Sequence, residues 1–139
     1  EVERTLYFGE LDGIRTNAIE TVLESREAIL KNLRAGITFG EIYEAAAQVY
    51  RRNNLEKMLP GRFGHGIGLS AHELPGIVRD SNQIILPNMI FTVEPGLTHK
   101  EWGGTRISET VLIKDNGYEI LTKSNADITR LSRYKGESK

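Results

Sequence analysis

The sequence predicts an α+β fold, because a short strand and two helical segments are followed by several strands. The first strand, about residues 2–9, is rich in β-branched and aromatic residues. Apolar residues at helical spacing then predict helices over about 14–35 and 39–52. Apolar runs that end at proline, glycine and asparagine predict the strands of the second half.

The ends of the two predicted helices carry their own signals. Gly36 lies where a C-cap glycine is expected after the first helix. Thr38 and Glu41 have the spacing of a capping box at the start of the second. Asn53 and Asn54 are expected to end it.

The remaining elements follow from turn residues and alternation. A glycine-rich stretch, residues 60–76, is expected to be irregular. Two apolar strands are expected around Pro87 and Asn88, the second of them running from Met89 to Glu94. The last elements expected are a strand at 103–113, a hairpin turn at 114–117, a returning strand at 118–122 and a flexible tail at 130–139.

Composition limits the function classes. The chain has 139 residues, enough for one domain, and a net charge of -1, which argues against a nucleic-acid partner. It has no cysteine, so disulfides and thiolate metal sites are excluded. It has no apolar run long enough to cross a membrane and no signal peptide, so we expect a cytoplasmic protein without a membrane partner. The first residue is not Met and a strand begins at once, so a piece of a longer chain is expected.

Two of the three histidines lie seven residues apart in the stretch 61–76. Glycines alternate around His65, and this spacing allows a backbone or a ligand to approach one face closely. His65 is therefore either a functional histidine or a hydrogen-bonded core histidine. His72, followed by Glu73, is also consistent with an ordinary surface pair.

Two glutamates lie in otherwise apolar strands. Glu94 ends such a strand, where a buried carboxylate is costly unless it is paired or bound to a metal, although its head could also reach solvent. Glu109 shares a strand face with Ile107 and Val111, which suggests a partnered carboxylate. Together with His65, these carboxylates form a ligand set that suits Mn, Co, Zn or Fe(II).

Three stretches then resemble a known family: GHGIGLSAHELPGI (64–77), MIFTVEPGL (89–97) and GGTRISETVLIKDNGYEILT (103–122). They resemble the pita-bread (M24) family of methionine aminopeptidases, Xaa-Pro aminopeptidases, prolidases and metal-free creatinases. The resemblance implies a curved antiparallel sheet with helices on its outer face and the active site in its concave face. Because the family's catalytic domains are longer, residues 1–139 are expected to be the C-terminal portion of one, with an incomplete sheet.

The resemblance implies a metal-dependent peptidase of the Xaa-Pro dipeptidase or aminopeptidase type. Two divalent ions would hold a hydroxide that attacks the scissile carbonyl. His65 matches a metal-binding histidine, and Glu94 matches a metal-ligating glutamate that also serves as acid or base. His72 matches the histidine that contacts the substrate and the tetrahedral intermediate. Arg106 is expected to bind substrate, and Glu109 is a further candidate metal ligand.

Three departures from the family pattern bear on metal binding. Ser108 occupies the position of the glutamate that bridges two metals, with Glu109 next to it. A slip of one residue turns Glu109 to the other face, so it replaces the bridge only if a bulge intervenes. Glu1 aligns with the second family aspartate, and no histidine shortly precedes the GHGIG motif. These departures leave metal occupancy open.

Two other functions therefore remain open. One is a small-amide hydrolase or lyase on the same scaffold, without metal, in which His65 acts as the general acid and base. The other is an inactive fragment or binding module. An incomplete sheet exposes apolar faces and edges. We therefore expect a homo-oligomer such as a dimer, or pairing with the missing N-terminal half.

Overall fold

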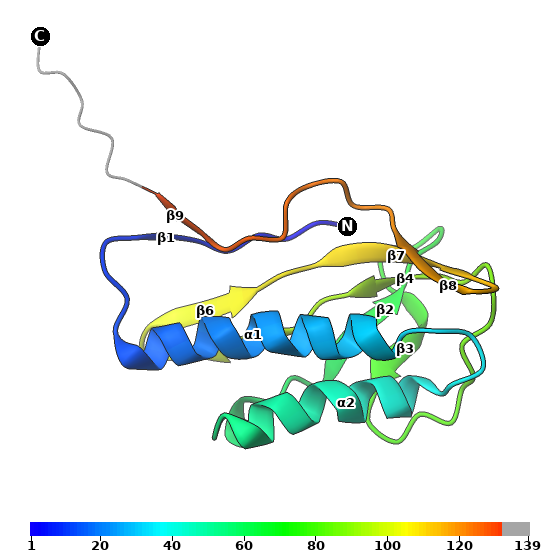
Figure 1. Cartoon of the computed structure of the whole chain (residues 1–139), viewed down its shortest axis with the longest axis horizontal. Coiled ribbons are helices and arrows are strands. Elements are labelled where there is room, and N and C mark those ends of the chain that lie inside the picture. Colours follow the sequence, from blue (N-terminus) through cyan, green and yellow to red (C-terminus); the bar gives the residue numbers. More distant parts are fainter. Residues whose placement is uncertain (132–139) are drawn as a thin grey trace, which may run out of the picture.

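The computed structural model describes residues 1–131 (Figure 1). A strand, two helices and then a series of strands follow one another, which confirms the α+β prediction. The elements are β1 (Leu6–Phe8), α1 (Gly13–Asn32), α2 (Phe39–Arg52), the 3-10 turn η1 (Glu56–Met58), β2 (Arg62–Gly66), β3 (Glu73–Val78), β4 (Ile90–Val93), β5 (Gly96–His99), β6 (Gly103–Arg106), β7 (Glu109–Lys114), β8 (Gly117–Ile120) and β9 (Thr129–Leu131).

Asp12 and Thr38 cap the N-terminal ends of the two helices, but Gly36 is not the C-cap of the first, because that helix ends at Asn32 with Leu33 as its C-cap and Gly36 lies in the following turn with a φ of 90°. α1 begins after Asp12, whose side chain accepts a hydrogen bond from the first turn, and it ends at Asn32, three residues before the expected Ala35. α2 has the predicted bounds and the predicted capping box. The backbone N–H of Glu41 donates to Thr38 Oγ1 at 3.2 Å, and the backbone N–H of Thr38 donates to the Glu41 carboxylate at 2.8 Å.

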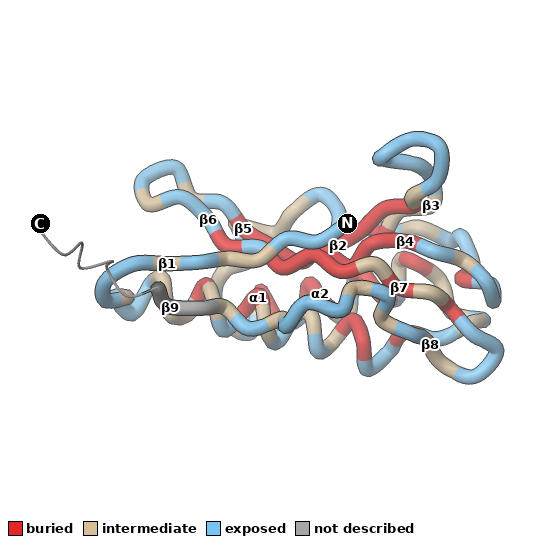
Figure 2. Tube along the Cα trace, turned by 90° about the horizontal axis from the view of Figure 1, so that it is seen from above, coloured by how far each residue is buried: buried red, intermediate tan, exposed pale blue. Residues whose placement is uncertain are grey.

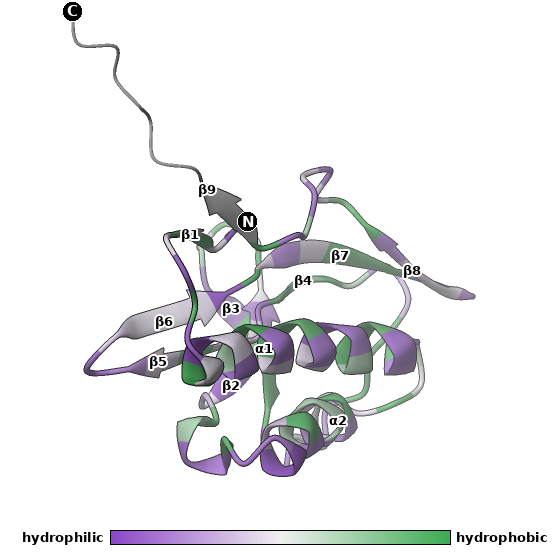
Figure 3. Ribbon diagram, turned by 60° about the vertical axis from the view of Figure 1, so that its left-hand side comes forward, coloured by the Kyte–Doolittle hydropathy of each residue, from purple (hydrophilic) through white to green (hydrophobic). Residues whose placement is uncertain are grey.

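The main sheet has five antiparallel strands in the order β3-β2-β4-β7-β8. Both helices lie on one face of it, and Figure 3 shows hydrophobic and hydrophilic segments alternating along each helix. The core lies between the helices and this face of the sheet. Its largest fully buried side chains are Tyr50, Phe39, Phe63, Phe91, Ile29, Ile42, Ile77, Ile85, Ile107, Ile113, Val22 and Val93.

The ribbon that contains β4, β5, β6 and β7 is interrupted but keeps its register. The pairs β4–β7 and β5–β6 belong to different sheets, so the expected single strand 103–113 is divided in two. On one side of the interruption Val93 pairs with Glu109, and on the other Gly96 pairs with Arg106. The same number of residues separates these pairs on both strands, so neither strand contains a bulge at this point.

The glycine-rich stretch 60–76 is not irregular, because it contains β2 and the start of β3. A Cβ added at Gly64 would lie 2.0 Å from the carbonyl oxygen of Thr92. Only glycine therefore lets β2 lie this close to β4. The alternating glycines mark strands that pack backbone against backbone, as the close-approach interpretation of this stretch predicts.

The predicted strand before Pro87 is wrong. Residues 83–86 run beside the connection between the helices: Ile85 N–H donates to the carbonyl of Ile37 at 2.8 Å, and Phe39 N–H donates to that of Gln83 at 3.0 Å. An isolated bridge is the only strand-like pairing there among residues 1–131. Of its apolar side chains, Ile85 is buried, whereas Ile84 and Leu86 are 50% and 53% exposed.

Both ends of the described chain meet in a small parallel sheet. β9 pairs with β1, and Leu131 lies opposite Phe8. Of the expected flexible tail, residues 132–139 lie outside the described part, so that flexibility stays a prediction. Within residues 1–131 we find no helix that is long and apolar enough to cross a membrane.

Candidate metal centre

Three potential metal ligands converge on the sheet, and they come from distant parts of the chain. His65 Nε2 lies 3.3 Å from Glu1 Oε2 and 3.6 Å from Glu94 Oε2. The ligand atoms all lie within 4.8 Å of one another. Figure 2 shows the N-terminal end of the chain beside the buried parts of β2 and β4, which carries Glu1 to the other two residues.

The sheet holds the His65 ring in an orientation suited to metal binding. The backbone N–H of His65 donates to Thr92 Oγ1 at 2.9 Å, and Nδ1 lies 2.9 Å from the carbonyl oxygen of Gly66. A carbonyl only accepts, so Nδ1 carries the proton and Nε2 presents a lone pair. Nε2 is buried and has no hydrogen-bond partner among the described residues. A buried lone pair that faces two carboxylates is suited to bind a cation.

The continuous register of the ribbon places Glu94 directly opposite Ser108, so both side chains lie on one face. Each carboxylate of the site already binds one polar group. Ser108 Oγ donates to Glu1 Oε1 at 2.6 Å, and Arg62 Nε donates to Glu94 Oε1 at 3.1 Å. Glu94 is buried at 6% exposure, whereas the Glu1 side chain is 30% exposed.

The two carboxyl groups respond to this environment in opposite directions. Burial raises the pKa of Glu94 above its usual value, and the hydrogen bond from Arg62 only partly offsets this. Burial also acts to raise the pKa of Glu1, but hydrogen bonds to Ser108 and Glu94 bring it below its usual value. Glu1 is therefore the carboxylate that ionises first, and Glu94 is the group that keeps a proton longer.

Glu109 does not join this group, which corrects its assignment as a metal ligand. It pairs with Val93, so its side chain points to the helix side of the ribbon. Its buried carboxylate lies 2.8 Å from Arg26 Nε of α1 and 3.6 Å from a guanidinium nitrogen of Arg4. The expectation that Glu109 has a partner is correct, but the partners are arginines.

The two residues expected to contact substrate lie at the edge of the site. The His72 ring is 4.2 Å from the His65 ring, centroid to centroid, and His72 is exposed. Arg106 is also exposed. Together with Arg62 and Glu94 it lines an open pocket of about 400 Å³. The structure thus places His72, Arg106 and the three candidate ligands in one region.

Sequence reasoning missed Arg62. Strict alternation along β2 puts Arg62 and His65 on opposite faces. The pairing of β2 with β3 is irregular between these two residues, and this shift brings both side chains to Glu94. No signal in the sequence marks this irregularity except the neighbouring glycines.

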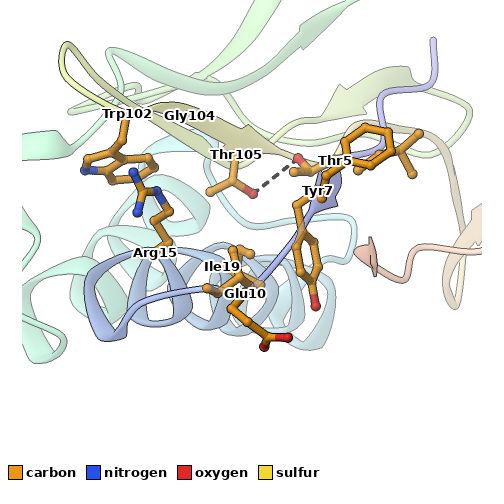
Figure 4. Close-up of a pocket in the computed structure, with 11 residues that line it drawn as sticks. Thr5, Tyr7, Glu10, Arg15, Ile19, Trp102, Gly104 and Thr105 are labelled. Atoms are coloured by element: carbon orange, nitrogen blue, oxygen red, sulfur yellow. Dashed lines mark hydrogen bonds between the residues drawn. The ribbon is translucent and has the colours of Figure 1, made fainter. Parts of the chain in front are cut away.

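A second pocket, of about 360 Å³, lies between β1, the start of α1 and β6 (Figure 4). Thr105 donates to Thr5 across it at 3.2 Å, and Arg15 lies 5.9 Å from the centre of the Trp102 ring. Glu1, His65 and Glu94 form the one group suited to a metal among the described residues, and they lie outside this pocket. The candidate functional site is therefore the first site described, the group of Glu1, His65 and Glu94, and not the second pocket.

The residues at the first site fit a divalent ion. One neutral imidazole nitrogen and two carboxylate oxygens form a donor set that Mn, Co, Zn and Fe(II) accept. The unpartnered Nε2 atom of His65 gives this fit its structural support.

Comparisons with known proteins agree with this picture. The model of metallopeptidase family M24 matches residues 1–115. A Staphylococcus epidermidis protein described as an uncharacterized peptidase is 32% identical over 88% of this chain and 35% of its own length. The Xaa-Pro dipeptidase of Pyrococcus furiosus is 30% identical over 92% of this chain and 37% of its own length.

Among solved structures, the X-Pro aminopeptidase from Thermotoga maritima superimposes with a TM-score of 0.87 at 33% identity. The match covers 94% of this chain and 37% of that one. The chain thus spans little more than a third of the length of the relatives it matches. The partial pita-bread fold expected from the sequence is confirmed, and the chain belongs to metallopeptidase family M24.

Proposed function

We propose that the protein is a metal-dependent peptidase of the Xaa-Pro dipeptidase or aminopeptidase type, to which this chain contributes Glu1, His65 and Glu94 as metal ligands. The observation that carries the proposal is the buried Nε2 atom of His65, which faces two carboxylates without a hydrogen-bond partner. The Pyrococcus furiosus relative, named as an Xaa-Pro dipeptidase, supports the substrate class.

A divalent ion bound here would supply a Lewis acid that polarises a peptide carbonyl and activates a water molecule. The residues of the chain then divide the remaining tasks. Glu94, whose pKa burial raises, accepts and returns a proton. His72 lies beside His65 at the exposed edge and donates a hydrogen bond to the oxygen that gains charge. Arg106, across the open pocket, binds a carbonyl or carboxylate of the substrate.

A second candidate is a small-amide hydrolase or lyase on the same scaffold. The ion pair of Arg62 with Glu94 and the serine at position 108 favour it, because both reduce the capacity of the site for metal. In this case His65 would act as the general acid and base without a metal. Arg62 and Arg106 would bind a small anionic substrate in the pocket that they share.

We also propose that another chain segment covers the exposed side of β1. Leu6 and Phe8 of β1 are 55% and 65% exposed, and Val2, which precedes the strand, is 54% exposed, so apolar side chains lie open on this surface. A segment that corresponds to the N-terminal half of the pita-bread domain, or a second copy of the chain, would bury them. A cytoplasmic location, and the absence of nucleic-acid and membrane partners, stay predictions.

The test is an activity panel with purified protein, Mn²⁺ or Co²⁺, Xaa-Pro dipeptides, longer peptides with proline in second position, and small amides. The peptidase proposal predicts cleavage that chelator abolishes and that His65→Ala removes. His99→Ala is the matched control, because His99 stacks on Trp102 away from the site. Turnover of small amides that survives chelation but is lost in His65→Ala would favour the second candidate. If no substrate is turned over, the remaining possibility, an inactive scaffold, is favoured.

A further inference from the structure

We propose that the residues of this chain bind one divalent ion rather than two, and that the Arg62 guanidinium performs the charge-neutralising role of the second ion at Glu94. The inference rests on the proposed metal site but not on peptides as substrates. It departs from the two ions that the family resemblance implies.

The first argument is the number of available donor atoms. Glu1 Oε2 and Glu94 Oε2 face His65 Nε2 at 3.3 and 3.6 Å. The other oxygen of each carboxylate is occupied: Glu1 Oε1 accepts from Ser108, and Glu94 Oε1 accepts from Arg62. The described residues therefore offer three donors to one point. At a second point, both carboxylates would first have to lose an existing hydrogen bond.

The second argument is the missing bridge. Ser108 is opposite Glu94 and supplies a neutral hydroxyl where a bridging carboxylate would be expected. Glu109 cannot replace it, because the ribbon keeps its register and Arg26 holds the Glu109 carboxylate on the other face. No further group of three histidine or acidic side chains comes together among residues 1–131.

The third argument is charge. Glu1 and Glu94 contribute two negative charges and Arg62 one positive charge. One divalent ion gives the group a net charge of +1, whereas a second would give +3 where His65 and Glu94 are 3% and 6% exposed. Like charges repel strongly where water is excluded. Arginine cannot relieve this repulsion by losing a proton, because it stays charged in proteins.

The experiment is a titration of the purified protein with Mn²⁺ or Co²⁺ by calorimetry, without substrate. The unmodified protein should bind one equivalent. Arg62→Gln removes a positive charge next to a ligand, so the ion should bind about tenfold more tightly or better. Arg52→Gln is the matched control: it also removes a guanidinium bonded to a glutamate, Glu24 at 3.0 Å, but on the outer surface of the helices. The affinity of Arg52→Gln for the ion should be the same as that of the unmodified protein.

A double variant tests directly whether the site can be made to bind a second ion. Arg62→Gln combined with Ser108→Glu frees one oxygen of Glu94 and supplies the missing carboxylate, so it should bind two equivalents. The electron paramagnetic resonance spectrum of bound Mn²⁺ should then change from that of an isolated ion to that of a spin-coupled pair. Because Ser108 is fully buried, circular dichroism must show that this variant folds. If it does not, Arg62→Gln alone decides the question.

The proposal is overturned if the unmodified protein binds two equivalents or none, or if Arg62→Gln binds the ion no more tightly. A folded double variant that still binds one equivalent would also overturn the roles of Arg62 and Ser108. None of these readouts needs turnover, so failure of the peptidase proposal leaves this one standing.

Discussion

Ser108 lies directly across the ribbon from Glu94, on the face that carries the candidate metal centre. The register is the same on both sides of the interruption, with Val93 opposite Glu109 and Gly96 opposite Arg106. Successive residues of a strand point to opposite faces. The side chain of Ser108 therefore lies at the site, whereas that of the next residue, Glu109, points to the other face and anchors the sheet to α1.

The ion pair between Glu109 and Arg26 is expected to stabilise the fold rather than to bind metal. Glu109→Gln leaves a largely buried guanidinium without its main partner and should lower the free energy of unfolding by up to about 3 kcal/mol. Urea denaturation measures this. Glu27→Gln is the control, because Glu27 is the exposed partner of Arg26, and it should cost less than about 1 kcal/mol. Equal effects of the two variants would contradict the assignment.

Gly64 is expected to be indispensable for the pairing of β2 with β4. Gly64→Ala places a methyl group against the carbonyl oxygen of Thr92, so the strands must separate. We expect a loss of about 3 kcal/mol or more in the free energy of unfolding. Gly61→Ala, for which no atom lies within 4 Å of the added Cβ, should change it by about 0.5 kcal/mol at most. Thermal unfolding of the two variants should separate them clearly, and similar midpoints would refute the argument.

Tyr50 connects α2 to the ribbon just beyond Glu94. Its hydroxyl donates to the carbonyl of Gly96 at 2.9 Å, and burial raises its pKa, so it stays a donor at all ordinary pH values. Tyr50→Phe leaves that buried carbonyl without its donor and should cost about 1–3 kcal/mol. Tyr7→Phe, at the rim of the second pocket, should cost less than about 0.5 kcal/mol. Chemical denaturation provides the comparison. If Tyr50→Phe leaves the free energy of unfolding unchanged, the carbonyl of Gly96 finds another partner.

The capping box predicts a pH-dependent contribution to stability. The backbone N–H and the hydroxyl of Thr38 hold the pKa of Glu41 below its usual value. A group with a lowered folded-state pKa stabilises above its unfolded pKa and loses this contribution as pH falls through the folded pKa. The free energy of unfolding should therefore fall below about pH 4.5 in part through Glu41.

Glu41→Gln keeps the hydrogen-bonding shape of the box but removes the titrating group. Its stability at low pH should decline less steeply than that of the unmodified protein. Glu20→Gln, on the exposed face of α1, removes a carboxylate that caps no helix. It should leave the pH dependence of stability as it is. Urea unfolding across the acid range measures all three slopes. If Glu41→Gln has the unmodified slope, the capping carboxylate does not carry this dependence.

Metal should stabilise the folded chain. An ion that binds only the native state at about 100 times its Kd adds about 2.7 kcal/mol to the free energy of unfolding. Mn²⁺ or Co²⁺ should therefore raise the Tm, and chelator should restore the original value. His65→Ala should abolish the shift, whereas His99→Ala should retain it. A shift of equal size in His65→Ala would mean that the ion binds elsewhere.

Much of the fold could be predicted from local patterns. The bounds of α2 and its capping box follow from residues within one helical turn of each other, so no distant contact was needed. The glycine-rich β2 and the non-strand 83–86 could not be predicted in this way. Gly64 is favourable in a strand only because β4 lies against it, and residues 83–86 are held by hydrogen bonds to the segment before α2, which is distant in the sequence.

The candidate site also contains residues that could be predicted from local patterns and residues that could not. The sequence by itself determined His65 and Glu94, because their motifs and the cost of burying a carboxylate in an apolar strand are local properties. Only the tertiary structure decided that Glu1 joins them, that Arg62 turns toward Glu94 and that Glu109 faces α1. The physical reason is register. The face to which a strand residue points depends on pairing with strands far away in the sequence, and a shift of one residue reverses it.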